Sequence, residues 1–564
     1  MNDRDSMLGV EGGARQRGSA ERAPRSRAPA LHADLKALAI LLLVTVTLRG
    51  WLLFTTEVAA RDSVGYIRQA LELENPHMTW GDVLRKNEQH PGYPLAILAV
   101  SKPVRALLDL TPFSMQFSAQ LVSGLAAILL VFPMFYLGKA LHDRATGFWG
   151  ALLFQFLPLS AHTLSDGCSE ALYFLFIASA LLAGIKAMQG TSLWRFGLCG
   201  ALCALAYLVR PEGAIILVAM AVVLLAVQWV PGWRRPWLRM IACGSSLTVA
   251  ALLVGSLYFG FTHCFTNKPA AKEIMHLQIS CHDDFGTRFP LLACIWGVHA
   301  DTVGKLGVGR ALGMLATELV QGFHYVGGLA VLLGLWWFRG LLRQRLGPWI
   351  LIVVGGLYCL VLIRLGMSAG YISDRHVMVM IMCGCYPAAA ALRKMPRRWL
   401  QRGSRIEDRV SGIEDRGLQI EDRRSRFSIL NPQSSILCLM FMLAFCLPKT
   451  LQPLHANRAG HHAAGLWLEQ HVHPGDQVVD DHCWAHYYAG LVFEEGKTYP
   501  ATIQPACYTV IGRTRDPRDD KGRKHTESAI QAAGGKVVYS WPPDRSPEAA
   551  KVVVYVQHKD GDSR

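Results

Sequence analysis

A short polar stretch that could carry chemistry follows an apolar run at 34–54 and reads RDSVGY over residues 61–66. Asp62 in this stretch can accept a proton from an acceptor hydroxyl, which is general base catalysis. Position alone also fits an ordinary solvated acid at the start of a loop. Tyr66 lies one helical turn further along and is expected beside the same pocket.

A second polar stretch, HPGYP at 90–94, precedes another apolar segment. Its prolines and glycine predict a turn. This turn places His90 and Tyr93 at the level of a polar head group, where they are expected to line a substrate pocket. The alternative is a turn that carries an interfacial aromatic residue, which is common in membrane proteins.

A third stretch, SDGCSE at 165–170, places two acids four residues apart. Asp166 and Glu170 would share one helical face, so both are candidates for the substrate pocket. A helix cap explains Asp166 equally well, because an Asp before a helix accepts hydrogen bonds from its free amides.

Basic residues stand at two further breaks, RPEG at 210–213 and YISDRH at 371–376. Guanidinium groups match phosphate oxygens in a two-point fashion, and a positive group stabilises the charge of a departing phosphate. Arg210, Arg375 and His376 are therefore candidate phosphate-binding residues. Anchoring of a helix end at the membrane interface is the alternative for each of them.

Metal-binding patterns are short and unspecific in this chain. One is His-Asp-Asp at 282–284, and the other places His482 and His486 four residues apart around Cys483. Structural roles are common for such groups, so whether the protein binds a metal is left open. The chemistry above requires no cofactor, and a divalent metal ion is compatible with it.

The amino-acid composition indicates what kind of secondary structure positions these residues. The chain has 564 residues, of which 51% are hydrophobic and 18% charged, whereas soluble domains carry about 25% charged residues. Apolar runs of about 20 residues are long enough to cross a bilayer. This excludes a soluble enzyme, a disordered chain and a β-barrel, whose strands alternate apolar and polar residues. The runs predict a mainly α, polytopic bundle of about eleven spans, near 34–54, 115–138, 147–163, 168–186, 194–209, 212–230, 238–262, 324–340, 347–366, 372–392 and 432–451.

The distribution of Lys and Arg predicts the orientation of the bundle. The net charge of +15 comes mostly from short connections between apolar runs, which indicates membrane topology and not nucleic-acid binding. Residues 1–33 are predicted to be a disordered cytoplasmic tail, with external loops at 55–114 and 263–323. The segment 93–108 carries Lys102 and Arg105 and is expected to be re-entrant or interfacial. Arg49 and Arg364 lie close enough to span ends to snorkel.

The C-terminal part differs in kind from the bundle. Residues 393–430 contain a threefold IEDR repeat and are predicted to be a low-complexity cytoplasmic insertion between the domain at 34–392 and the last span at 431–451. Residues 452–564 predict a small extracytoplasmic α/β domain, with strands at 477–480, 536–539 and 551–556 and helices at 463–472 and 526–533. In an oxidising compartment Cys483 and Cys507 could form a disulfide.

Taken together, the polar stretches resemble those of the polytopic GT-C glycosyltransferases. The similar group contains the protein O-mannosyltransferases and the lipid A aminoarabinose transferase-like proteins, including the RgtA/B/C/D-like proteins. The resemblance covers about residues 34–400 and rests on the order and spacing of the five stretches described above. The chain departs from the family in two places: Ser63 replaces a frequent second acid, and Gly92 replaces the second proline of His-Pro-Pro.

The resemblance implies an inverting membrane glycosyltransferase with a polyprenyl-phosphate-linked sugar as donor. The acceptor would be a hydroxyl of a lipid, glycan or protein on the outer side of the inner (plasma) membrane. The family's catalytic acid maps onto Asp62. A polytopic transporter and a non-catalytic membrane scaffold are the other two hypotheses. A transporter should place acids or broken helices near the membrane midplane, whereas most charges here are expected at span ends.

Overall fold

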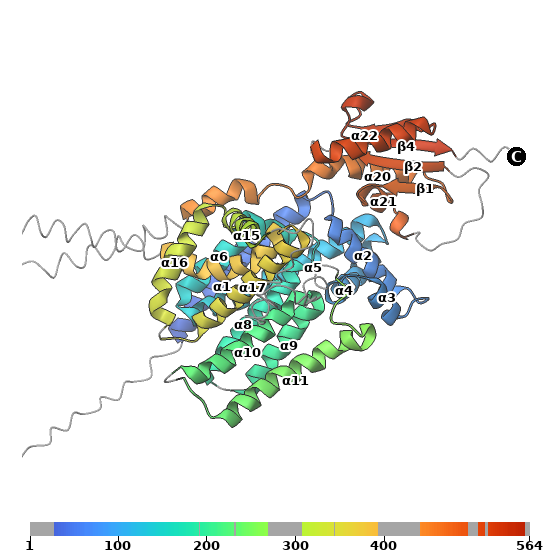
Figure 1. Cartoon of the computed structure of the whole chain (residues 1–564). Helices are drawn as coiled ribbons and strands as arrows, with labels where there is room; N and C mark the ends of the chain where they lie inside the picture. Colours follow the sequence, from blue (N-terminus) through green and yellow to red (C-terminus); the bar gives the residue numbers. More distant parts are fainter. Residues whose placement is uncertain are drawn as a thin grey trace, which may run out of the picture.

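The computed structural model describes residues 28–190, 192–230, 233–268, 307–342, 344–392, 440–493, 506–513 and 517–558. A bundle of long helices carries a smaller α/β domain at one end, beside the short helices α2, α3 and α4 (Figure 1). The helices of the bundle are α1 (Ala28–Thr55), α5 (Pro112–Leu141), α6 (Arg144–Phe156), α7 (Pro158–Ser165), α8 (Glu170–Gly190), α9 (Leu193–Val209), α10 (Ala214–Ala226), α11 (Trp237–Thr262), α15 (Val308–Gly322), α16 (Val326–Leu342) and α17 (Gly347–Ala369). A helical segment at Asp374–Leu392 and a short helix at Met440–Thr450 complete it.

Within the described residues, seven helical segments are long and apolar enough to cross a membrane, or eight if the bent pair at 308–336 counts as one span. Two further apolar helices, Leu193–Val209 and Met440–Thr450, are shorter. A multi-pass membrane protein follows from these segments. The count of eleven spans and their orientation stay predictions.

The expected continuous span at 147–163 is divided into two helices. Proline lacks the amide hydrogen that would continue the backbone ladder, so α6 ends at Phe156 and α7 begins at Pro158. The carbonyl of Gln155 at this break accepts a hydrogen bond from Arg49 at 3.3 Å, and the carbonyl of Phe156 accepts one from the Thr450 hydroxyl at 2.7 Å.

The expectation that Arg49 snorkels to the surface is wrong. Its side chain is only 3% exposed, and its guanidinium also donates to the Ala161 carbonyl at 2.5 Å and the Ser165 hydroxyl at 2.6 Å. The break between α6 and α7 leaves backbone acceptors free inside the bundle, and a buried donor satisfies them.

The segment 55–114, which was expected to be an external loop, forms three helices: α2 (Arg61–Glu74), α3 (Trp80–Lys86) and α4 (Gly92–Leu108). Helix α4 corresponds to the segment expected to be re-entrant or interfacial. Its Arg105 forms a two-point ion pair with Glu74 of α2, at 2.7 and 2.9 Å. This pair joins the C-terminal ends of the two helices.

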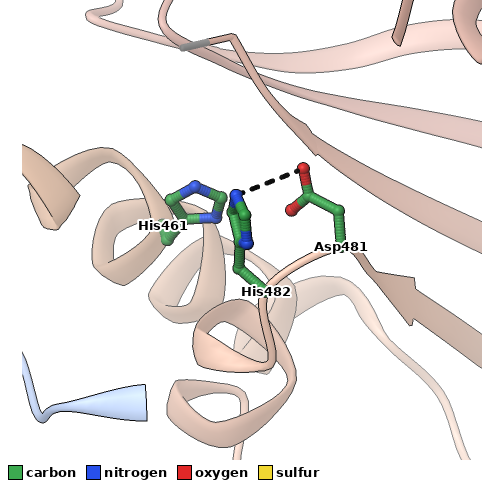
Figure 2. Close-up of side chains that lie close together, drawn as sticks. All are labelled: His461, Asp481 and His482. Atoms are coloured by element: carbon green, nitrogen blue, oxygen red, sulfur yellow. Dashed lines mark ion pairs between the residues drawn. The ribbon is translucent and has the colours of Figure 1, made fainter. Parts of the chain in front are cut away.

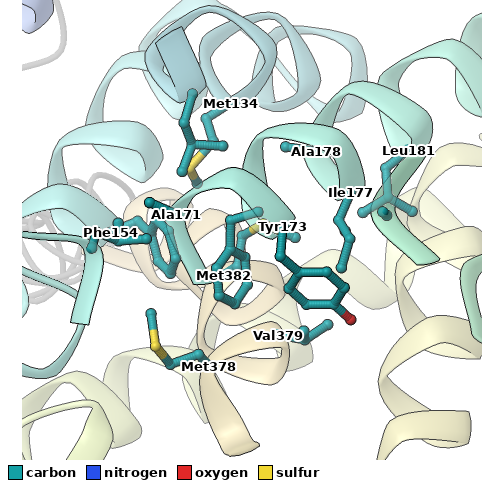
Figure 3. Close-up of a cluster of buried hydrophobic side chains, with 14 of the residues drawn as sticks. Met134, Phe154, Ala171, Tyr173, Ile177, Ala178, Leu181, Met378, Val379 and Met382 are labelled. Carbon is teal, nitrogen blue, oxygen red and sulfur yellow. The ribbon is translucent and has the colours of Figure 1, made fainter. Parts of the chain in front are cut away.

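The core of the bundle lies between α5, α6, α8 and the segment Asp374–Leu392 (Figure 3). Met134, Phe154 and Ile177 are fully buried there. Small residues permit closer contacts elsewhere in the bundle, as membrane helices require. A Cβ atom at Gly200 of α9 would lie 2.0 Å from the Leu247 carbonyl oxygen of α11, so a larger residue cannot be accommodated without moving these two helices apart.

The C-terminal domain confirms the predicted α/β class and adds one strand. Its sheet has the order β1 (Gln477–Asp480), β2 (Ala506–Gly512), β4 (Val552–His558), β3 (Lys536–Trp541), with β1 parallel to β2 and the other pairs antiparallel. Strand β4 reads VVVYVQH and is buried on both faces, as expected for a central strand. Helices α20 (Ala459–His471) and α21 (Trp484–Tyr488) cover one face, and α22 (Pro517–Ala532) covers the other.

Helix α21 attaches this domain to the bundle immediately before α2. The Trp484 indole N–H donates to the Ala59 carbonyl at 2.7 Å, and the Ala59 amide donates to the Tyr488 hydroxyl at 2.7 Å. Cys483 and Cys507 are free thiols, so the structure does not contain the disulfide that the sequence allowed. The IEDR repeat lies outside the described residues.

Candidate active site

A cavity of about 850 Å³ opens at the end of the bundle that carries α2. Its walls come from α2, α8, α10, α17, the connection before α10 and the turn at 371–376. Its polar lining consists of Asp62, Tyr66, Glu88, Gln89, Glu170, Tyr173, Arg210, Glu212, Lys268, Tyr358, Tyr371, Ser373, Asp374, Arg375 and His376. Residues from distant parts of the chain thus meet at one site.

Asp62 is held in the first turn of α2. The N-terminal end of a helix favours a negative charge, because its first amides point outward without partners. The side chain of Asp62 is 47% exposed, so the carboxylate remains accessible from the cavity. Its Oδ2 atom accepts a hydrogen bond from Arg375 Nη1 at 2.8 Å.

A chain of alternating charges continues from Asp62 across the cavity floor. Arg375 Nη1 also lies 3.8 Å from Glu170 Oε1, and that same oxygen is 2.7 Å from Arg210 Nη1. Arg210 in turn lies 3.2 Å from Glu212. Glu170 is almost fully buried, and two guanidinium groups compensate its charge. It therefore holds both arginines in position at the cavity.

The turn that carries Arg375 and His376 is capped locally. The amide of Ser373 donates to His376 Nδ1 at 3.2 Å, which closes a capping box over the 3-10 turn Asp374–Val377. The bonded Nδ1 leaves Nε2 as the ring nitrogen that can meet a ligand in the cavity.

Lys268 is a cavity cation that the sequence analysis did not single out. It follows α11, and its only sequence signal was a lysine just beyond the end of a span. Burial lowers the pKa of its ammonium group, and the nearby Glu212 carboxylate partly opposes this. Among the residues that the structure describes, no carboxylate forms an ion pair with Lys268.

The cavity is apolar on the side that faces α10 and α17. Ile215 and Val218 from α10 and Leu357, Val361 and Leu365 from α17 line this side. Val218 is 51% exposed, so this wall reaches the outer surface of the bundle. One side of the cavity thus suits a hydrocarbon chain and the other suits a charged group.

Six of the nine predicted site residues line this one cavity: Asp62, Tyr66, Glu170, Arg210, Arg375 and His376. Tyr66 bonds through its hydroxyl to Ser169 at 2.9 Å, and burial raises the pKa of this hydroxyl, so Tyr66 stays protonated. Proximity does not test the catalytic roles of these residues, which stay predictions.

His90, Tyr93 and Asp166 lie behind the cavity wall and do not line it. His90 is buried, stacks on Tyr258 at 4.5 Å and bonds to Thr266 at 3.0 Å; burial lowers its pKa to about 3. The Tyr93 hydroxyl donates to the Ala119 carbonyl at 2.8 Å.

Asp166 faces the C-terminal domain and bonds to His455 at 2.9 Å. Sequence position alone could not reveal these three environments, because each depends on a partner far along the chain.

The two departures from the family pattern have steric explanations. Ser63 is fully buried, and a Cβ atom at Gly167 would lie 2.6 Å from its hydroxyl, so an acidic side chain at 63 would be forced against that turn. A Cβ atom at Gly92 would lie 2.8 Å from the Leu208 carbonyl oxygen. Glycine at this position lets α4 pack closely on α9.

Within the described residues, the group of side chains close enough to share a metal ion lies in the C-terminal domain and not in the cavity. It consists of His461, Asp481 and His482 (Figure 2). The sequence had paired His482 with His486, whereas the structure brings His482 to a histidine of another helix. The His-Asp-Asp pattern at 282–284 lies outside the described residues.

Comparison with known proteins supports one enzyme class. Residues 104–259 match the family model of dolichyl-phosphate-mannose-protein mannosyltransferases, and a comparison with curated protein sequences finds no match. ArnT from Cupriavidus metallidurans bound to undecaprenyl phosphate superimposes with a TM-score of 0.56 at 12% identity, over 94% of this chain and 98% of that one. Its apo state gives 0.55 at 13% identity, over the same shares of the two chains.

A crystal structure of the Archaeoglobus fulgidus oligosaccharyltransferase is also similar. The superposition covers 95% of this chain and 76% of the oligosaccharyltransferase chain, with 13% sequence identity and a TM-score of 0.48. The fold of the chain is that of ArnT, and together with the family match over 104–259 it supports a GT-C glycosyltransferase.

Proposed function

We propose that the protein transfers a sugar, with inversion, from a polyprenyl-phosphate donor to an acceptor hydroxyl outside the cytoplasm. The two-sided cavity supports this donor class, since its apolar wall suits an isoprenoid chain and its arginines suit a phosphate. The similar ArnT structure holds undecaprenyl phosphate. The plasma membrane is the proposed location, and a lipid, glycan or protein is the acceptor.

The observation that carries the proposal is the contact between Asp62 and Arg375, at 2.8 Å on the wall of one cavity. It pairs a group that can take a proton with a group that can hold a phosphate. When the donor phosphate contacts Arg375, it competes with the Asp62 carboxylate for the guanidinium. The carboxylate is then available to the acceptor hydroxyl.

Transfer then requires one displacement at the anomeric carbon. The acceptor oxygen forms a bond to this carbon, and its proton passes to Asp62. The bond from the anomeric carbon to the phosphate oxygen breaks, and polyprenyl phosphate leaves with the bonding electrons. Attack opposite the leaving group inverts the configuration at that carbon.

Four cationic or ionisable side chains stabilise the leaving phosphate in this proposal: Arg210, Lys268, Arg375 and His376. They are held at the cavity before the reaction, so little reorganisation is needed as the charge develops. Because these groups can neutralise a phosphate, the proposal requires no metal ion. A divalent ion in the cavity stays compatible with it, since Asp62 and Glu88 also line the wall.

Binding of undecaprenyl phosphate to the purified full chain in detergent tests the donor site without knowledge of the sugar. A charge-assisted hydrogen bond contributes about 1.5–3 kcal/mol, so Arg375→Gln is expected to weaken binding by about 10- to 150-fold. Arg85→Gln is the matched control, because Arg85 forms an exposed pair with Asp82. Equal affinity of Arg375→Gln and the wild-type protein would overturn the assignment.

A further inference from the structure

Three potential metal ligands converge in the C-terminal domain, apart from the cavity. His461 belongs to the first turn of α20, and Asp481 and His482 directly follow β1. Their ligand atoms all lie within 4.8 Å of one another. The two imidazole rings are 5.1 Å apart, and the Asp481 carboxylate points toward the ring of His482 (Figure 2). The sequence separates these groups by about twenty residues, so the fold alone brings them together.

The buried histidine has a ring nitrogen that no protein group satisfies. His461 is 3% exposed, and its Nδ1 atom has no hydrogen-bond partner among the described residues. The nearest carboxylate oxygen, Asp480 Oδ1, is 4.0 Å away, which is too far for a hydrogen bond. A buried polar atom without a partner is costly, and native structures rarely keep one without a reason. The other ring nitrogen, Nε2, lies on the side of Gly512, whose amide donates to Asp481.

Charged side chains of both signs lie near the three ligands. Arg458 lies 4.9 Å above the Trp484 ring and its charge opposes a cation nearby, whereas the carboxylates of Asp480 and Asp481 favour one.

Contacts behind the ligands hold them in place. Asp481 Oδ2 accepts a hydrogen bond from the Gly512 amide at 2.9 Å. The Asp480 carboxylate accepts hydrogen bonds from the backbone amides of His482 at 3.0 Å and Ala485 at 2.6 Å. These two bonds fix the turn between β1 and α21. A Cβ atom at Gly512 would lie 2.6 Å from His461 Nε2, so glycine leaves the space that the ring occupies. Such supporting contacts orient metal ligands in known sites.

We propose that His461, Asp481 and His482 bind a divalent metal ion of the zinc class. Two imidazoles and one carboxylate form a set that zinc accepts, with its remaining position open to water. Ligand atoms about 2.0–2.1 Å from a tetrahedral ion lie about 3.4 Å apart. Since all three ligand atoms lie within 4.8 Å of one another, no pair has to approach by more than about 1.4 Å. The side chains of His482 and Asp481 are 27% and 35% exposed, so small shifts of these side chains can close this gap without breaking the contacts behind them.

The ion would connect two elements that bear on the catalytic end of the bundle. It would join α20 to the turn before α21, and α21 holds the backbone of Ala59 through Trp484 and Tyr488. Ala59 lies three residues before Asp62. The site is therefore a structural metal site that stabilises the position of the N-terminal end of α2. It takes no part in the transfer chemistry.

Metal analysis of the full chain, purified in detergent without a polyhistidine tag, tests the site. The wild-type protein should retain close to one zinc ion per chain after dialysis against buffer containing added zinc. His482→Ala and Asp481→Asn should each bind zinc about tenfold more weakly or worse, which is the scale of loss at metal sites. His462→Ala in α20 and His486→Ala in α21 are matched controls and should retain the ion.

Cobalt(II) gives a second readout that does not depend on activity. Its visible absorption should show a low-symmetry, four- or five-coordinate site in the wild-type protein and in the two controls, and this absorption should be lost in His482→Ala. Equal zinc content in the ligand variants and the controls would overturn the proposal. So would loss of the ion in Asp62→Asn, because that result would place it in the cavity.

Discussion

Asp62→Asn separates proton transfer from donor binding more sharply than any other substitution in the cavity. The amide has nearly the same shape as the carboxylate but cannot accept the proton of the acceptor hydroxyl. General base catalysis contributes about 10²- to 10⁴-fold, so the rate of sugar transfer should fall by this factor. Donor binding should not fall with it, because Asp62 competes with the phosphate for Arg375.

The exposure of the pair sets the size of the effect on binding. The side chains of Asp62 and Arg375 are 47% and 38% exposed, and ion pairs this accessible contribute at most about 1 kcal/mol. Removing the carboxylate should therefore leave undecaprenyl phosphate affinity unchanged or raise it by up to about fivefold. Loss of the pair should also change the thermal midpoint of unfolding only slightly.

Two measurements on the same preparation decide the outcome. Transfer is followed in proteoliposomes made with a lipid extract of the native membrane, and undecaprenyl phosphate affinity is measured in detergent. Asp82→Asn is the control, because Asp82 is an exposed acid of α3 that pairs with Arg85 at 2.8 Å outside the cavity. Full transfer by Asp62→Asn would refute the base assignment. A parallel loss of transfer and affinity would show that Asp62 shapes the donor pocket instead.

Three further predictions concern stability and pH. Arg49→Met should lower the free energy of unfolding by about 2–4 kcal/mol, because it removes the donor to the buried Gln155 carbonyl at the break between α6 and α7 and to the Ala161 carbonyl of α7; an unchanged thermal midpoint would contradict this. His455 has a raised pKa: burial is the largest single effect and opposes its charge, but the hydrogen bond to Asp166 and the negative charge of that carboxylate together outweigh burial. Its stabilising contact should be complete below about pH 6.5 and lost as pH rises through the higher folded-state value. The protection factors of the amides at 165–170, which are corrected for the intrinsic rise of exchange with pH, should therefore fall over this range, and His455→Ala should remove that fall. Gly200→Ala should cost about 1–3 kcal/mol from overpacking against α11, whereas Gly244→Ala, with nothing within 4 Å of its Cβ, should be neutral or stabilising in thermal unfolding.

The charged stretches near helix ends were informative because they interrupt strongly apolar runs. Asp62, Arg210 and Arg375 were each visible as polar residues at such breaks, and the cavity does bring them together. Lys268 was equally visible at a span end but carried no motif. His90 and Tyr93 were chosen because the motif HPGYP predicts a turn, but their side chains pack inside the protein and do not line the cavity. A turn can be recognised from the sequence, whereas the direction in which its side chains point cannot.

The sequence by itself determined the membrane class, the existence of most long helices and the α/β character of the C-terminal domain. These properties depend on runs and alternations of apolar residues within about twenty positions, so they can be read locally. The tertiary structure alone decided that Asp62 contacts Arg375 across 313 residues of chain, that Arg49 is buried at a helix break, and that His461 meets His482. Such contacts depend on how helices cross and where their backbones approach, and no local pattern encodes that geometry.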